Sequence, residues 1–315
     1  MILTVTLNPT LDRAVFVRNF RLGTLTRAEK EVLTPSGKGV DASLVLHELG
    51  HPTLATGLLA GHHGRLLVTL LDAIGVAHDF VWAEGETRHA LVLVDQAARA
   101  QSTISASTLH ADERHLQALL RTMSRHLPSA RFAILAGSLP AGCLADAYPR
   151  LIAHCRQAGV PTLLDTSGAA LAAGIAETAP EIVKINLLEL GELLGATGDD
   201  LVAIAGAAAA LRERLSNQAV IVTLGVQGVV AATDSGLWHA QPPCVAVVND
   251  AGAGDALAGC VAWSRAAGRD WPDALRLGAA AAAAVVMTAG TAQCDRAEVE
   301  RLLPAVEVRQ LPIVP

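Results

Sequence analysis

Residues 248–255, Val248-Asn249-Asp250-Ala251-Gly252-Ala253-Gly254-Asp255, follow a β-rich stretch and lead into an apolar segment, Ala256 to Ala266, with the composition of a buried helix. The two glycines let the backbone turn tightly with its N–H groups pointing inward. Donors at a helix N-terminus, together with the helix dipole, bind anions such as phosphate. The stretch therefore predicts a turn and a helix with an anion site at its start.

Asp255 would stand beside that anion site. A carboxylate in this place can accept the proton of an attacking hydroxyl group, while nearby N–H groups stabilise charge on a phosphoryl group in transfer. The local residues are equally consistent with a structural role, because Asp is also a common N-cap residue.

From about Asp112 onward, short apolar runs alternate with segments of helical period. This alternation predicts a mainly parallel sheet covered by helices on both faces. The predicted strands are Phe132 to Ala136, Pro161 to Asp165, Ile182 to Ile185 and Ala219 to Val222, and the predicted helices are Asp112 to His126, Leu144 to Gln157, Ala169 to Ile175 and Leu187 to Leu194.

The first third of the chain has a different pattern, with extended segments at Arg13 to Val17, Glu31 to Thr34, Ala90 to Val94 and Ser102 to Ala106. They predict either a small separate sheet that serves as a lid over a pocket, or an extension of the main sheet. No repeat or linker divides the chain. We therefore expect a single α/β domain over residues 1–315, with a discontinuous β lid formed roughly by residues 12–36 and 80–108.

Composition excludes several classes of partner. The 315 residues carry a formal net charge of −6 and are only 3% aromatic, so neither a general attraction to nucleic acid nor a stacking platform for single strands is expected. The most apolar segment, Leu277 to Gly290, is shorter than the roughly 20 residues that a membrane-spanning helix needs. The first residues have the pattern of a strand and turn rather than of a leader peptide. We expect a cytoplasmic protein without nucleic-acid or membrane partners.

Gly252-Ala253-Gly254-Asp255 resembles the C-terminal signature of the PfkB (ribokinase-like) family of carbohydrate kinases, in which the Asp is the catalytic base. Pro35 to Ser43 is similar to the family's glycine-rich N-terminal signature. The resemblance implies a ribokinase-like three-layer sandwich with a small β lid, and a kinase that uses ATP and Mg²⁺. It also implies a homodimer formed through the lid.

Further segments match the family in the right order between the two signatures. They begin at Thr6, Gly137, Lys184 and Thr223, although each alone could be an ordinary turn or helix start. The resemblance implies a catalytic group of Asp255, Gly252, Ala253 and Gly254; sugar contacts from Asp12, Gly37, Gly39, Asp41 and Ser138; nucleotide contacts from Lys184, Asn186, Thr223, Gly225 and Gly228; and a magnesium contact from Glu189.

Three cations indicate a substrate that already carries a phosphate group, because Arg can hold a phosphate through two hydrogen bonds. They are Lys38, Arg88 and Arg27, and their alternative partners in surface ion pairs would be Asp270 or Glu31. The chain thus looks most similar to the phosphosugar branch of the family, which includes the 1-phosphofructokinases and tagatose-6-phosphate kinases.

Two departures from the family pattern keep other functions open. Asp41 stands where the family has Asn, and Ser102 to Ser107 lacks the usual residues of the lid strand. An ionised Asp only accepts hydrogen bonds and would repel a phosphate, whereas Asn also donates. The alternatives are a kinase for an unphosphorylated sugar or a nucleoside, and a non-catalytic sensor of sugar or nucleotide with the same fold.

Overall fold

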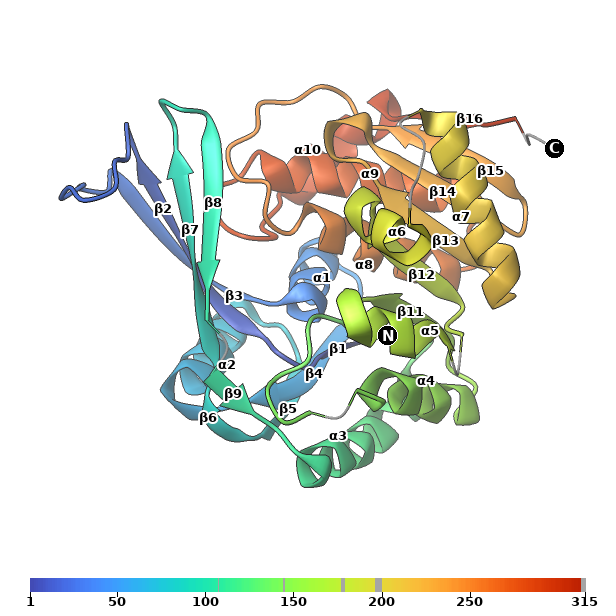
Figure 1. Cartoon of the computed structure of the whole chain (residues 1–315), viewed down its shortest axis with the longest axis horizontal. Helices are drawn as coiled ribbons and strands as arrows, with labels where there is room; N and C mark the ends of the chain where they lie inside the picture. Colours follow the sequence, from blue (N-terminus) through green and yellow to red (C-terminus); the bar gives the residue numbers. More distant parts are fainter. Residues whose placement is uncertain (107, 144, 177–178, 196–199, 313–315) are drawn as a thin grey trace.

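A ten-stranded sheet crosses the body of the protein (Figure 1). The computed structural model describes residues 1–106, 108–143, 145–176, 179–195 and 200–312. The strand pairs from β5 to β13 are parallel and those from β13 to β16 are antiparallel. In sheet order the strands are β16 (Glu307–Gln310), β15 (Gly236–Gln241), β14 (Val229–Thr233), β13 (Ala219–Thr223), β12 (Ile182–Asn186), β11 (Thr162–Asp165), β10 (Phe132–Ala136), β1 (Ile2–Thr6), β4 (Thr53–Leu59) and β5 (His78–Trp82).

Helices cover both faces of this sheet, because successive strand residues point to opposite sides. In β1, Ile2 belongs to one apolar core and Leu3 to the other. The α/β architecture expected from the sequence is confirmed. The first face carries α1 (Lys38–Glu48), α8 (Ala253–Ala266), α9 (Trp271–Val286) and α10 (Arg296–Leu302), and the second carries α3 (Glu113–His126), α4 (Ala147–Gln157), α5 (Gly168–Ala176), α6 (Leu187–Leu194) and α7 (Leu201–Leu215).

A separate four-stranded sheet extends from the body at the left of Figure 1. It contains all four extended segments predicted in the first third, so they do not extend the main sheet. Ser107 of the predicted lid segment Ser102 to Ser107, and Leu144 of the predicted helix Leu144 to Gln157, lie outside the described residues. That this sheet acts as a lid stays a prediction. Its order is β3 (Lys30–Ser36), β2 (Thr10–Val17), β7 (Arg88–Asp95) and β8 (Ala100–Ser105); β6 (Glu84–Glu86) pairs with β9 (Thr108–His110), and α2 (Gly61–Ile74) packs beside α1.

The packing of α1 against α8 brings the starts of both helices to one place. A Cβ atom added to Gly259 of α8 would lie 3.2 Å from the backbone oxygen of Ala42 in α1, so only a very small residue fits between them. The carboxyl ends of the parallel strands point toward the same region, which is where open α/β sheets bind ligands. The fold therefore joins two helix N-termini and a row of strand ends.

None of the helices in the described ranges combines the length and the apolar character that a membrane crossing requires. The apolar segment at Leu277 to Gly290 instead forms the second half of α9 and the turn after it.

Gly57 of β4 should not tolerate a side chain. Its φ is +143°, and an added Cβ would lie 1.9 Å from the Thr6 backbone oxygen. We expect Gly57→Ala to lower the free energy of unfolding by at least about 2 kcal/mol, measured by urea denaturation. The control is Gly206→Ala in α7, where the added Cβ meets nothing within 4 Å and should add up to about 1 kcal/mol. Equal stability of the two variants would contradict this description of the sheet.

Candidate active site

Helix α8 begins with an open N-terminus. Its N-cap residue is Gly252, with φ of +89° and no side-chain cap, so the alternative that Asp255 is the N-cap is wrong. The helix begins at Ala253, three residues before the predicted start at Ala256, and Asp255 lies in its first turn. The first N–H groups of a helix have no partner within it. Those of Ala253 and Gly254 are therefore available to an anion.

Gly252 is required at this corner by close packing. An added Cβ would lie 2.6 Å from the backbone nitrogen of Ala292, so the chain near Ala292 presses directly against the turn. At Gly254 an added Cβ would lie 2.7 Å from Nζ of Lys184. The ammonium group of Lys184 thus lies beside the positive end of the helix, in the region where a bound phosphate would receive both charges.

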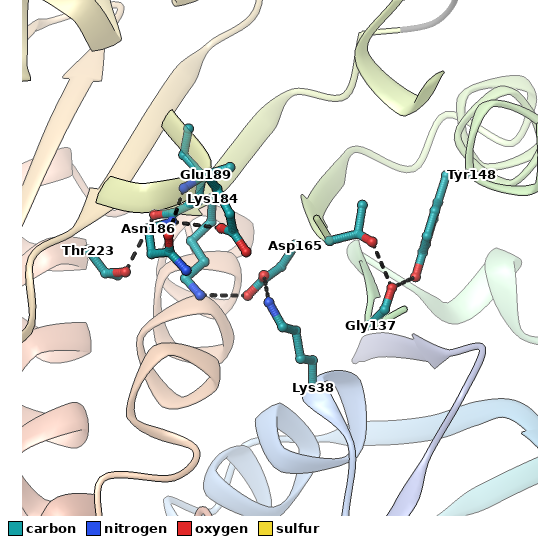
Figure 2. Close-up of polar contacts among 10 residues, drawn as sticks. Lys38, Gly137, Tyr148, Asp165, Lys184, Asn186, Glu189 and Thr223 are labelled. Carbon is teal, nitrogen blue, oxygen red and sulfur yellow. Dashed lines mark hydrogen bonds and ion pairs between the residues drawn. The ribbon is translucent and has the colours of Figure 1, made fainter. Parts of the chain in front are cut away.

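Asp165 holds two lysines at this point (Figure 2). Its Oδ1 is 2.5 Å from Nζ of Lys38, and its Oδ2 is 2.8 Å from Nζ of Lys184. Burial alone would raise the pKa of Asp165, but the two ammonium groups hold it below its usual range. One buried carboxylate thereby fixes two cations that come from α1 and β12.

The sequence did not indicate Asp165, although it indicated both of its lysines. Its one available signal is position, since it is the last residue of β11 and so stands at the carboxyl edge of the sheet. The partners that the sequence suggested for the cations are engaged elsewhere. Glu31 forms an ion pair with Arg13 at 2.9 Å, and Asp270 caps α9.

The charge environment of Asp255 suits a general base. Burial and the negative charge of Asp165 raise the pKa of Asp255 to about 6, and the cations Lys184 and Lys38 limit the rise. A base whose pKa lies near neutrality combines an ionised carboxylate at pH 7 with a useful affinity for the proton.

A second acidic group, Asp12 and Asp41, lies next to Asp255. Oδ2 of Asp12 accepts hydrogen bonds from Ser36 at 3.1 Å and from Thr291 at 2.9 Å, whereas its buried Oδ1 has no partner in the described part of the chain. Burial raises the pKa of Asp12 in spite of those hydroxyl donors. Oxygens of this kind can accept hydrogen bonds from sugar hydroxyl groups.

The cations predicted to hold a substrate phosphate are separated in the structure. Arg88 donates to the backbone oxygen of Asn8 at 3.2 Å and to Ser105 Oγ at 3.0 Å, and its charge acts on Asp12 and Asp41. Arg27 is exposed in the loop between β2 and β3, beyond the end of β2 that lies farther from Asp12. The structure therefore brings Arg88, and not Arg27, to the acidic group.

The two glycines of the N-terminal signature allow close contact with the turn after β1. A Cβ on Gly37 would lie 2.9 Å from Pro9 Cα, and one on Gly39 would lie 2.6 Å from Thr6 Oγ1. Ser138 accepts a hydrogen bond from Nδ2 of Asn8 at 3.2 Å. Asn8 was not among the predicted site residues, although it lies within the matching N-terminal segment.

Asn186 and Glu189 form a capping box at the start of α6. The Glu189 N–H donates to Asn186 Oδ1, and the Asn186 N–H donates to Glu189 Oε2, both at 2.8 Å (Figure 2). The described residues contain no cluster of three or more His, Cys, Asp or Glu side chains that could hold a metal ion unaided. Glu189 nevertheless faces Lys38 and so lies near the charged site. One carboxylate beside a bound polyphosphate suits Mg²⁺, which keeps several waters.

The predicted nucleotide turn follows β13 directly. Thr223 pairs in register with Asn186, so the turn and the start of α6 are neighbours. Gly225 and Gly228 have φ of +58° and +81°, and a Cβ on Gly228 would lie 2.1 Å from the Ala240 backbone oxygen. Close backbone packing thus requires Gly228, whereas Gly225 is required only by its conformation.

Known proteins resemble this chain along nearly its whole length. The sequence profile of the pfkB family carbohydrate kinases matches residues 6–298. A 1-phosphofructokinase from Vibrio cholerae is 30% identical over 310 residues, 98% of this chain and 97% of that protein. Phosphofructokinase-2 from Escherichia coli, solved in complex with substrates and products, has a TM-score of 0.90 at 26% identity and covers 96% of this chain and 98% of its own. Ribokinase from Arabidopsis thaliana, at 23% identity, has a TM-score of 0.76 over 96% of this chain and 98% of its own. The ribokinase-like fold expected from the sequence is confirmed.

Replacing Asp165 by Asn should leave two ammonium groups without their counter-charge. We expect the free energy of unfolding at pH 7 to fall by about 3–5 kcal/mol. Because the lysines lower the folded-state pKa of Asp165, its stabilisation is present above the unfolded pKa of about 3.9 and is lost as the pH falls through the folded value. The difference between wild type and Asp165→Asn should therefore shrink below about pH 4.

Chemical denaturation at pH 7 and at pH 3 measures this difference. The exposed carboxylate of Asp273 provides the control, since Asp273→Asn should change stability by less than about 0.5 kcal/mol. A loss for Asp165→Asn no larger than that of the control would contradict the ion-pair assignment.

Proposed function

The chain belongs to the pfkB family of carbohydrate kinases, and from that premise we propose that it transfers the γ-phosphoryl group of ATP to a hydroxyl group of a phosphorylated ketohexose. One observation carries the proposal. Asp255 lies in the first turn of a helix whose N-terminus is uncapped, beside the ammonium groups of Lys38 and Lys184. A base, amide donors and fixed cations at one point are the parts that phosphoryl transfer needs.

In the proposed reaction, Asp255 takes the proton from the attacking sugar hydroxyl as the new O–P bond forms, while the bond from the γ-phosphorus to the bridging oxygen breaks and ADP leaves with that oxygen. The N–H groups of Ala253 and Gly254 and the nearby lysines stabilise the negative charge on the transferred phosphoryl group. Glu189 would hold Mg²⁺ when it is bound, and the ion would neutralise charge on the nucleotide phosphates. Lys184, Asn186, Thr223, Gly225 and Gly228 form the proposed nucleotide side of the site.

On the sugar side, Asp12 offers its free Oδ1 to the sugar hydroxyl groups, and Arg88 offers its guanidinium group to the substrate phosphate. Gly37, Gly39 and Ser138 would supply close backbone and hydroxyl contacts. Arg88 supports a phosphorylated substrate over a free sugar, because a guanidinium group can hold a phosphate through two hydrogen bonds. The 1-phosphofructokinase relative supports the same choice, and fructose 1-phosphate is the first substrate that we propose.

We further propose a homodimer formed through the second sheet, which works as a lid, in the cytoplasm where ATP and sugar phosphates are available. The sheet has β3 and β8 as its edges. Four large apolar side chains on it or on its loop are exposed, Phe20 at 40%, Leu22 at 90%, Leu25 at 88% and Ile104 at 66%. Exposed edges with apolar side chains favour pairing with another chain.

Asp255→Asn should keep the fold and the substrate affinity but lower kcat by about 10²- to 10⁴-fold, because it removes the base without changing its shape. In the wild type, the base is active only when ionised, so kcat/KM should rise with pH and level off above about pH 6. A coupled assay of ADP release measures both effects. Activity of Asp255→Asn equal to that of the Asp273→Asn control would contradict this mechanism.

Arg88→Ala should raise KM for the sugar phosphate by about 10- to 100-fold, the cost of losing a hydrogen-bonded charge partner. The test is a panel of fructose 1-phosphate, fructose 6-phosphate, tagatose 6-phosphate and free sugars, assayed with ATP. Arg88→Lys should recover only part of the loss, because an ammonium group lacks the planar fork of Arg. Arg13→Ala, which removes an exposed cation of the same sheet, is the control.

If free sugars or nucleosides are phosphorylated best, and Arg88→Ala leaves their KM unchanged, the enzyme acts on unphosphorylated substrates. Binding of sugar phosphate without any turnover would instead indicate a sensor.

A further inference from the structure

The buried hydroxyl group of Ser36 joins two carboxyl groups. Its Oγ lies 3.1 Å from Asp12 Oδ2 and 3.0 Å from Asp41 Oδ2. Ser36 is 2% exposed, Asp12 7% and Asp41 3%, so water does not replace these contacts. A serine hydroxyl carries one proton and can donate to only one of the two carboxylates. The second contact is a hydrogen bond only if one carboxyl group is protonated and donates to Ser36 Oγ.

The surroundings identify which carboxyl group carries that proton. Asp12 already accepts a hydrogen bond from Thr291 at 2.9 Å, so it is the better-supported anion. Oδ1 of Asp41 is buried and receives no hydrogen bond from a donor among the residues that the structure describes, and the carboxyl group of Asp255 lies within hydrogen-bonding reach of Asp41. An ionised Asp41 would leave this oxygen charged and unsolvated between two other carboxylates, which is costly.

Charged groups face Asp41 from three elements. Asp12 of β2 and Asp255 of α8 oppose its ionisation, and Arg88 of β7 favours it. Burial and the charges of Asp255 and Asp12 raise the pKa of Asp41 well above its usual range, and the donors Ser36 and Gly37 do not offset them. The electrostatics thus agree with the hydrogen-bond geometry.

We infer that Asp41 is held as an uncharged carboxylic acid that donates a hydrogen bond to Ser36, which in turn donates to Asp12 and fixes the orientation of the Asp12 carboxylate. Asp41 is then a positioning residue for the sugar site, a role that rests on the proposed function. A neutral Asp has the shape of Asn and keeps one donor.

The protonation state can be tested without any substrate. A neutral Asp41 in the folded protein and an ionised one in the unfolded protein make the wild type lose stability relative to Asp41→Asn as the pH rises. The ratio of their folding equilibrium constants should change by about tenfold per pH unit above about pH 4. Urea denaturation at pH 5, 6 and 7 measures this ratio. A ratio independent of pH, or one that changes in favour of the wild type, would overturn the inference.

Asp273→Asn is the matched control, since an exposed carboxylate should give a constant ratio over the same pH range. A second readout is infrared difference spectroscopy at pH 7. The carbonyl band of a protonated carboxyl group should be present in the wild type and absent from Asp41→Asn. Absence of this band from the wild type would also overturn the inference.

The positioning role is tested by activity. Asp41→Asn should lose less kcat/KM at pH 7 than Asp41→Ala, because the amide retains the donor, whereas Asp41→Ala should lose about tenfold or more, mainly through KM. Equal losses in the two variants would overturn the positioning role. Absence of turnover in the wild type would reject the proposed function instead, and it would leave the stability result unaffected.

Discussion

One ion triad, in which the buried carboxylate of Asp165 lies between Lys38 and Lys184, is the interaction on which the site depends. The two lysines come from α1 and β12, so a single carboxylate joins the first helix of the fold to the middle of the sheet. Removing one partner from such a group leaves an uncompensated buried charge, which costs far more than an exposed ion pair. The triad also sets the electrostatics of its neighbours. Burial and the charge of Asp165 raise the pKa of Asp255 to about 6, and the lysines limit that rise, which keeps the carboxylate of Asp255 ionised at pH 7.

Backbone packing places Asp255 in the electrostatic field of this ion triad. Gly252 fits against Ala292 and Gly259 fits against Ala42, so α8 approaches its neighbours more closely than a larger residue would allow. The helix start carries no side-chain cap. Its N–H groups therefore point, with the lysines, at the place where a phosphate would lie. The N–H groups of α8, Asp255 and the lysines therefore lie together at the start of this helix, and the proposed chemistry depends on that arrangement.

Local sequence patterns predicted the bounds of some helices and strands correctly. The strand from Phe132 to Ala136 and the helix from Leu187 to Leu194 have the predicted bounds, because buried strands and capped helices leave clear signals in a few residues. The start of α8 was predicted too late, since Gly in the first turn disguises a helix. Arg27 was predicted at the substrate, but the pairing of β2 with β3 carries it to the other end of the hairpin. The family resemblance supplied most of the site residues.

Contacts between distant parts of the chain could not be predicted in this way. Thr291 contacts Asp12 from 279 positions away in the sequence, and Ser36 joins Asp12 to Asp41 through a geometry that no spacing encodes.

The central claim is that the base and the amides at the start of α8 share one site with the end of bound ATP. A crystal structure with a non-hydrolysable ATP analogue and sugar phosphate tests it most directly. The account predicts the terminal phosphate within hydrogen-bonding distance of the Ala253 and Gly254 N–H groups, with the sugar hydroxyl next to Asp255. A terminal phosphate bound away from this helix start would contradict it.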